Sequence, residues 1–104
     1  MGIKDNKKVF IIQPMGGRSE DEVLRERAEI ISELTKRGYD TVESYFRDGA
    51  PIGCVHESIY YLGKSIERLC WADYIYLVPG WEQGRGCVIE HAVAEAYHIP
   101  EVIL

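Results

Sequence analysis

Two spacings of apolar residues alternate along this chain. Short runs rich in β-branched and aromatic residues cover 7–13, 39–46, 73–79 and 100–104. Between these runs, apolar residues recur three or four positions apart over 19–38, 56–72 and 86–97. Short apolar runs bounded by Gly and Pro are typical of buried strands, and the wider spacing is typical of amphipathic helices. The pattern predicts the order strand, helix, strand, helix, strand, helix, strand.

The helix predicted over residues 19–38 has the clearest boundaries. Ser19 followed by Glu22 forms a capping box, acidic residues fill the first turn, and Gly38 is a good terminator. The apolar stripe that should face the core consists of Leu24, Ala28, Ile31 and Leu34. The comparable stripe of the helix over 56–72 consists of Ile59, Leu62, Ile66 and Leu69.

Strands that alternate with helices predict an α/β fold with a parallel sheet and right-handed crossovers. In such sheets, ligands bind at the carboxyl ends of the strands. Residues 14–18 follow the first strand and residues 79–86 follow the third, and both loops contain glycines and an arginine. We therefore expect the two loops to meet in one shared site.

Composition narrows the setting of this fold. The chain has 104 residues, of which 46% are hydrophobic, and this is enough for one domain with one core. A formal net charge of -5 argues against a surface for DNA or RNA polymers, and no apolar run approaches a membrane span. Three cysteines at irregular spacing argue against a disulfide framework and fit a reducing, cytoplasmic compartment. We expect one domain over 1–104, with residues 1–7 as a flexible lead.

The two glycine-rich loops suit an anion. Glycine lets backbone N–H groups approach a ligand, and a helix N-terminus favours negative charge. Arg18 in the first loop and Arg85 in the second each add a forked cationic donor, which suits a phosphate or a carboxylate. The alternative is that the glycines only form tight turns and the arginines are solvated, since neither GxGxxG nor GxxxxGK[ST] occurs.

Glu90 is the candidate for chemistry beside these loops. It lies in the first turns of the helix that follows the second loop, and its neighbours in sequence are Val88, Ile89, Ala92 and Val93. A carboxylate at the mouth of a partly apolar site can act as a nucleophile or a base. The alternative is an ordinary, exposed helix residue.

Aromatic residues and Cys/His pairs are the remaining candidates for ligand or metal contacts. A planar ligand would stack on an aromatic ring, although most aromatic residues of a small domain belong to its core. The available rings are Trp81, Tyr45, Phe46, Tyr60 and Tyr61, with Trp81 favoured because it lies within the loop. The spacing of the cysteines and histidines differs from that of common zinc sites, and we expect neither a metal nor a cofactor. The pairs concerned are Cys54 with His56 and Cys87 with His91.

Three segments of the chain resemble a known domain family. They are QPMGGRSEDEVLRER, YYLGKSIERLCWADYIYLVPGW and RGCVIEHAVAEAY. The family is a domain of unknown function common in phages and prophages of gut bacteria, and the resemblance runs from about Lys8 to Leu104. That family in turn is similar to the nucleoside 2-deoxyribosyltransferase superfamily, which includes the 2'-deoxynucleoside 5'-phosphate N-hydrolases.

The resemblance implies a fold and a chemistry. The fold would be a flavodoxin-like, Rossmann-like three-layer sandwich with a mostly parallel sheet of four to five strands, assembled as a homodimer or a larger homo-oligomer. In this superfamily a glutamate attacks C1' of the sugar and forms a glycosyl-enzyme ester, which water or a second base resolves. By position, that glutamate is Glu90. The phosphate would lie on the segments Gly16, Gly17, Arg18 and Gly84, Arg85, Gly86.

Two positions depart from the characterised enzymes. Those enzymes carry an aspartate eight residues before the aspartate that opens the third strand. Here Asp73 opens that strand, and Ser65 stands eight residues earlier. The hydrolases often have a serine six residues before the nucleophile, where this chain has Gly84. The candidate catalytic residues are therefore Glu90, Ser65 and Asp73.

Three functions stay open at this point. One is a nucleotide N-glycosidase or deoxyribosyltransferase acting on a (deoxy)nucleoside 5'-monophosphate. Another is a non-catalytic module of phage origin that binds or sequesters a nucleotide signal, and the last is a structural domain. The residues expected to bind the ligand are Gln13, Pro14, Met15, Gly16, Gly17, Arg18, Trp81, Gly84, Arg85 and Gly86.

Overall fold

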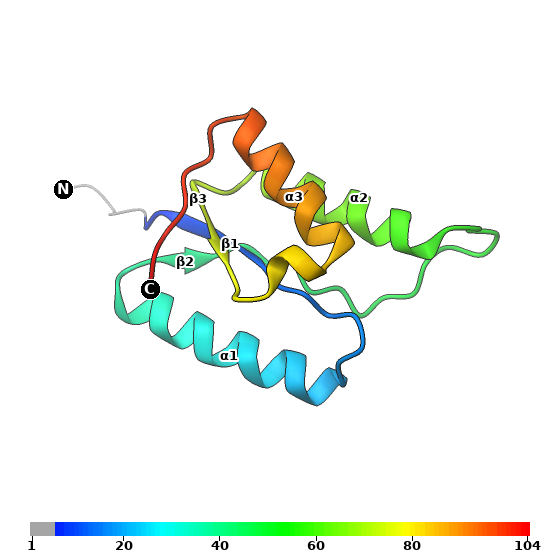
Figure 1. The fold of residues 1–104 in the computed structure, drawn as a ribbon, viewed down its shortest axis with the longest axis horizontal. Helices are drawn as coiled ribbons and strands as arrows, with labels where there is room; N and C mark the ends of the chain where they lie inside the picture. The colour runs from blue at the N-terminus through cyan, green and yellow to red at the C-terminus, as the bar shows by residue number, and fades with distance from the viewer. Residues whose placement is uncertain (1–5) are drawn as a thin grey trace.

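The computed structural model describes residues 6–104 and has an α/β fold (Figure 1). Its strands are β1 (Lys8–Ile12), β2 (Asp40–Thr41) and β3 (Tyr74–Leu77). They form one parallel, three-stranded sheet in the order β2-β1-β3. The helices are α1 (Glu20–Lys36), α2 (Glu57–Leu69) and α3 (Arg85–Ala96), and the 3-10 turn η1 (Trp81–Gln83) precedes α3. The predicted alternation is confirmed, but the predicted four to five strands are reduced to three.

The strand predicted over 100–104 is present only as a single bridge. Ile75 donates its N–H to the Pro100 carbonyl at 2.9 Å, and Val102 donates to the Ile75 carbonyl at 2.8 Å. Val102 is buried there, whereas Ile103 is 72% exposed. Pro100 has no N–H to extend the ladder, and only Val102 of this segment contributes to the core. The C-terminal segment therefore lies beside β3 without becoming a strand of the sheet.

The strand predicted over 39–46 ends early, at Thr41. One further hydrogen bond joins Val42 to the sheet, from its N–H to the Val9 carbonyl at 2.9 Å. Beyond it, side chains replace the ladder: the Glu43 carboxylate accepts the Tyr45 N–H at 2.8 Å, and Arg27 donates to the Ser44 hydroxyl at 2.6 Å. Such local contacts compete with strand pairing. Residues 44–46 consequently leave the sheet at its carboxyl end.

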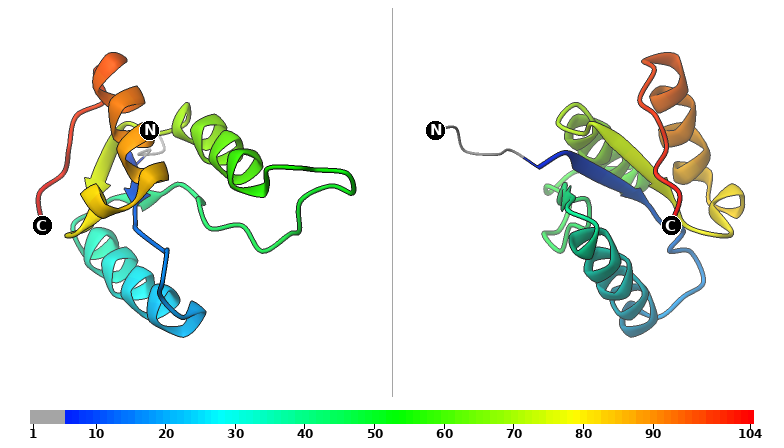
Figure 2. Two further views of the ribbon diagram at one scale, coloured as in Figure 1. Left: turned by 45° about the vertical axis from the view of Figure 1, so that its right-hand side comes forward. Right: turned by 90° about the vertical axis from the view of Figure 1, so that its left-hand side faces the viewer.

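Helices cover both faces of the sheet (Figure 2). Phe10 and Ile12 of β1 pack in a cluster with residues of α2 and α3, among them Leu69 and Ala94. Val9 and Ile11 pack on the opposite face, in a cluster that includes Leu34 of α1. All these strand residues are at most 2% exposed. A strand buried on both faces is typical of the centre of a parallel sheet, and β1 holds that position here.

The boundaries of α1 agree with the prediction, but its buried face does not. The Ser19 hydroxyl accepts the Glu22 N–H at 3.1 Å, so the predicted N-cap is confirmed. Val23, Arg27 and Leu34 are the buried residues of α1, whereas Ala28 is exposed and Leu24 and Ile31 are half-buried. The inward face is therefore rotated from the predicted stripe, and it contains an arginine. In α2, the predicted stripe fails only at Ile59, which is 65% exposed.

Lys7, the last residue of the predicted flexible lead, already pairs with the sheet. Residues 1–5 of the predicted flexible lead lie outside the described residues. Lys7, however, accepts the Asp40 N–H at 2.9 Å, directly before β1 begins. In the part of the chain that the structure describes, none of the helices combines the length and apolarity needed to cross a bilayer.

Candidate functional site

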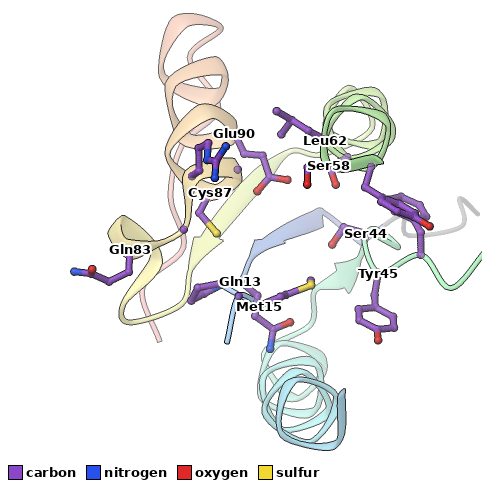
Figure 3. A pocket seen from close by; sticks show the side chains of 17 residues that line it. Gln13, Met15, Ser44, Tyr45, Ser58, Leu62, Gln83, Cys87 and Glu90 are labelled. Carbon is purple, nitrogen blue, oxygen red and sulfur yellow. The ribbon is translucent and has the colours of Figure 1, made fainter. Parts of the chain in front are cut away.

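A cavity of about 730 Å³ lies at the carboxyl ends of the strands (Figure 3). Its walls come from residues 13–16 after β1, residues 44–46 after β2, and one face of α2. Residues 83–87 and Glu90, from the turn and first turns of α3, complete it. The expectation that the loops after β1 and β3 meet at one site is thus confirmed for residues 14–16 and 83–86.

Glu90 points into this cavity, into the space between α3 and α2 (Figure 3). It is only 9% exposed. Because α3 begins at Arg85, its buried face is formed by Cys87, Glu90 and Ala94, which follow one another at helical spacing. Val88 and Ile89 are 44% and 38% exposed on the outside. A carboxylate is buried while two aliphatic residues face outward, so the alternative of an ordinary exposed Glu90 is wrong.

The surroundings of Glu90 make its proton labile near neutral pH. Burial raises the pKa of Glu90 to about 7, because the charged form loses hydration. A hydrogen bond from the Ser65 hydroxyl and the positive charge of Arg27 oppose this rise. Glu90 therefore exists in both protonation states close to pH 7, as a group that serves as nucleophile, base or acid requires.

Ser65 lies in the cavity wall beside Glu90. It belongs to a face of α2 on which Ser58, Leu62 and Ser65 follow one another at helical spacing. A serine hydroxyl has no charge to contribute at neutral pH and acts here as a hydrogen-bond donor. Glu90 is the one carboxylate among the lining residues that the structure describes.

Cys87 lies one turn before Glu90 and also lines the cavity. Burial and the nearby Glu90 charge raise the pKa of the Cys87 thiol to about 12. The thiol therefore stays neutral at pH 7 and is a poor nucleophile. Cys87 therefore behaves as a small apolar wall residue.

The turn before α3 is shaped by close packing. A side chain at Gly84 would place its Cβ 3.0 Å from the Cys87 sulfur and 3.5 Å from the Pro14 Cβ. Gly84 therefore allows this turn to approach both α3 and the loop after β1. Gly84 is also the N-cap of α3, without a side-chain cap, and the first turn of α3 has no acidic residue. The free N–H groups at this helix start border the cavity together with Arg85 and Gly86.

The first predicted phosphate loop is divided between two roles. Residues 13–16 line the cavity, but Gly17 and Arg18 do not. Arg18 instead donates to the Glu26 carboxylate at 2.8 Å and to the Pro14 carbonyl at 3.0 Å. These two contacts hold the guanidinium against α1 and away from the cavity. The prediction that Arg18 is a direct ligand contact is therefore not supported.

Asp73 and Trp81 also lie away from the cavity. The Asp73 carboxylate accepts the Lys8 N–H at 2.9 Å and so joins the amino ends of β1 and β3, opposite the site. Trp81 packs on the His91 ring, with 4.5 Å between ring centroids, and against the core. Asp73 is therefore placed as a structural residue. Trp81 does not line the cavity, so the structure does not support the prediction that it offers a stacking surface there.

The aromatic wall of the cavity is formed instead by Tyr45, Phe46 and Tyr61. Tyr61 donates its hydroxyl to the Asp48 carbonyl at 2.8 Å, which links α2 to the segment after β2. The Lys64 ammonium lies over the Phe46 ring, 4.8 Å from its centroid. These rings were among the sequence candidates, but the sequence favoured Trp81 because proximity along the chain was the only guide.

A polar network forms the floor beneath this wall. Arg27 donates to the Ser44 hydroxyl at 2.6 Å and to the Gln13 side-chain oxygen at 3.4 Å. Gln13 in turn donates to the Val23 carbonyl at 2.9 Å and to the Glu26 carboxylate at 3.0 Å. Arg27 and Ser44 were not predicted. A signal was present for Arg27, because it lies four positions after Val23 and seven before Leu34, on the buried face of α1.

The residues weighed as zinc ligands are dispersed. Cys54 lies in the segment between β2 and α2, whereas Cys87 is buried in the cavity wall. The His91 ring is covered by Trp81, and its Nδ1 is 3.9 Å from a Glu95 carboxylate oxygen. Within residues 6–104, no three side chains of the metal-ligating types are grouped closely enough to hold an ion.

Comparison with known proteins places the chain in a family. Searches of curated proteins and of solved structures gave no match. A family model described as a domain of unknown function (DUF4406) matches residues 7–103. That range contains β1 through α3 and every residue that lines the cavity. The chain therefore belongs to the DUF4406 family of domains of unknown function.

Proposed function

We propose that this protein is a nucleotide N-glycosidase or deoxyribosyltransferase that cleaves the N-glycosidic bond of a (deoxy)nucleoside 5'-monophosphate. The observation that carries the proposal is the buried Glu90 carboxylate, directed into a cavity at the carboxyl ends of parallel strands. The helix-covered parallel sheet supports a flavodoxin-like fold of the nucleoside 2-deoxyribosyltransferase type. The resemblance to that superfamily in the order and spacing of the segments around Gly16 and Glu90 supports the same chemistry, whereas Ser65 departs from it.

The reaction follows from the chemistry of a carboxylate. The ionised Glu90 attacks C1' of the sugar, the bond from C1' to the base nitrogen breaks, and its electron pair leaves with the base. The leaving base takes a proton from water, because no second carboxylate is found among the described lining residues. Water or a second base then attacks C1' and releases Glu90 from the ester. Without an acid beside the leaving group, turnover is expected to be slow and to favour bases that leave readily.

The start of α3 is the proposed phosphate subsite. The backbone N–H groups after Gly84 are free of side-chain caps, and Arg85 lines the same edge of the cavity. Among the described residues, no carboxylate lies within ion-pair distance of Arg85. Unpaired donors and a cation at a helix start favour a phosphate group. The base would then lie toward the aromatic wall of Tyr45, Phe46 and Tyr61.

The test is a panel of nucleosides and 5'-monophosphates incubated with the protein, with free base measured by chromatography. We expect base release from at least one monophosphate, and a loss of about a thousandfold or more in Glu90→Gln. Mass spectrometry of the denatured protein should detect the glycosyl ester in wild type and not in Glu90→Gln. Equal inertness of the wild type and the variant on the whole panel contradicts the catalytic proposal.

A binding module is the second candidate function, and Ser65 is the observation that favours it. Where the characterised enzymes carry an aspartate, this chain has a neutral hydroxyl that donates to Glu90. A protein of this kind would hold the nucleotide without cleaving it. Calorimetric binding of a monophosphate that is recovered intact, with similar affinity in Glu90→Gln, would support this function over catalysis.

A further inference from the structure

Arg27 is a buried cation whose contacts are with neutral groups. It is 5% exposed, on the inner face of α1. No carboxylate among the described residues lies within ion-pair distance of it. Burial of a guanidinium without an ion pair is costly, and burial lowers the pKa of Arg27. A charge kept at this cost calls for an explanation beyond packing.

Arg27 contacts two side chains that form the floor of the cavity. Its guanidinium donates to Ser44 at 2.6 Å and to Gln13 at 3.4 Å, and both acceptors belong to side chains that line the cavity. Ser44 belongs to the segment that leaves β2, and Gln13 directly follows β1. Ser44 also lies 3.5 Å from the Ile11 carbonyl, which it can donate to. One guanidinium thus fixes two polar groups from two different strand ends.

The charges around this network come from several elements. Among the charges that raise the pKa of Arg27, Glu43 from the segment after β2 contributes most, followed by Glu90 on α3 and Tyr45. Glu90 itself is faced by Ser65 from α2, by the neutral Cys87 thiol and by Arg27. Arg27 is therefore the cation whose field favours ionised Glu90, while burial opposes that ionised form.

We propose that Arg27 is a positioning residue of this site: it fixes Gln13 and Ser44 on the cavity floor and places its positive charge beneath the cavity into which Glu90 points. The catalytic meaning of this inference rests on the proposed function. The electrostatic part does not, because Arg27 acts on Glu90 whether or not a substrate is cleaved.

Two variants separate the charge of Arg27 from its fork of donors. Arg27→Gln removes the charge but keeps a side chain that donates hydrogen bonds, whereas Arg27→Lys keeps the charge but cannot reach both acceptors in the same geometry. The midpoint of Glu90 is measured by carboxyl ¹³C NMR titration, with Glu90→Gln identifying its signal. Arg27→Gln should raise that midpoint by about one unit, and Arg27→Lys should leave it near the wild-type value.

Activity measurements then test the positioning part. In Arg27→Gln, the acidic limb of the pH profile should move to higher pH with the Glu90 midpoint. In Arg27→Lys and in Ser44→Ala, kcat/KM should fall by about tenfold without movement of that limb. A folded Arg27→Gln with an unchanged Glu90 midpoint would overturn the proposal. So would unchanged kcat/KM in both Arg27→Lys and Ser44→Ala.

If Arg27→Gln does not fold, the same charge coupling can be measured from the side of residue 27. In Arg27→Lys, the lysine ammonium is observed by ¹⁵N NMR, and adding Glu90→Gln should lower its midpoint, because charge coupling is mutual. An unshifted lysine midpoint would contradict the coupling. If wild-type protein cleaves nothing, the proposed function fails, while both titrations still decide whether Arg27 acts on Glu90.

Discussion

Two loops of this molecule look alike in sequence and differ in what they do. One carries Gly16, Gly17 and Arg18 before α1, and the other carries Gly84, Arg85 and Gly86 before α3. The start of α1 is satisfied by its own segment, with a Ser19 cap and three acidic residues, Glu20, Asp21 and Glu22, in its first turn. The start of α3 has neither a side-chain cap nor an acid, and it borders the cavity. The residues that follow a glycine loop therefore decide whether it is free for a ligand.

The same contrast separates the carboxylates of the two helices. Burial raises the pKa of Glu26 on α1, but hydrogen bonds from Arg18 and Gln13 outweigh this effect, and its pKa lies below the usual range. Glu90 on α3 has no such pair, and its pKa is raised to about 7. The ion pair of Glu26 with Arg18 stabilises the start of α1, whereas ionisation of the buried Glu90 destabilises the fold.

The largest expected effect is on stability in Glu90→Gln. A raised folded-state pKa means that Glu90 contributes stability below pH 4.5, and that this contribution is lost as the pH rises through about 7. At pH 8 the variant should therefore be more stable than wild type by about 3 kcal/mol, from a shift of this size at 1.36 kcal/mol per pKa unit. Urea unfolding at pH 4 and pH 8 measures it. A variant that is less stable than wild type at pH 8 would show that Glu90 is a structural residue.

The next effect concerns glycine in the two loops. Gly84→Ala would place a methyl group 3.0 Å from the Cys87 sulfur, so we expect a loss of about 1–2 kcal/mol in unfolding free energy and weaker nucleotide binding. Gly16→Ala is the matched control, because no atom lies within 4 Å of the added Cβ and its φ is not positive. It should be neutral or slightly stabilising. Equal effects at the two positions would remove the distinction between the loops.

The third effect separates the two arginines. Arg85→Ala should weaken 5'-monophosphate binding by about tenfold and leave binding of the corresponding nucleoside unchanged, because only the phosphate contact is lost. Arg18→Ala should change the affinity much less, because Arg18 contacts Glu26 and Pro14 rather than the cavity. Calorimetry with both ligands measures these affinities. A stronger loss in Arg18→Ala than in Arg85→Ala would return the phosphate to the first loop.

The smallest effect is expected for Glu26→Gln. Its lowered pKa means that Glu26 contributes stability above its unfolded pKa and that this contribution is lost as the pH falls, the reverse of Glu90. The pair with Arg18 is partly exposed, so the loss at pH 8 should be below about 1 kcal/mol. Thermal unfolding at pH 8 and pH 3 compares the two states. A stabilised Glu26→Gln at pH 8 would contradict the opposite signs of the two carboxylates.

The sequence predicted what depends on nearest neighbours along the chain. The strand and helix order, the Ser19 cap and the position of Glu90 after a glycine turn all follow from local periodicity and capping. Contacts between distant segments were not predictable in this way. Arg18 pairs with Glu26 across a turn, and Arg27 reaches Ser44 across seventeen positions. The first pairing takes Arg18 away from the predicted ligand site, and the second holds Arg27 on the buried face of α1.

The early end of β2 was also unpredictable from residue types. Residues 39–46 have the β-branched and aromatic composition of a strand, but hydrogen bonds to Ser44 and Tyr45 draw the chain out of the sheet. Trp81 illustrates the same limit, since its ring is used by His91 and the core. The aromatic wall could be recognised only once α2 and the segment after β2 were side by side.

Because residues 44–46 leave the sheet, the cavity is lined by two kinds of segment. Glu90 and the Gly84 turn stand on elements packed into the core, whereas Tyr45 and Phe46 belong to a segment that is not part of the sheet. Tyr45 and Phe46 can therefore be substituted while the sheet and α3 stay intact. If the proposed function holds, exchange of Tyr45 and Phe46 alone would change which base the cavity accepts, and a library randomised at these two positions is the natural starting point.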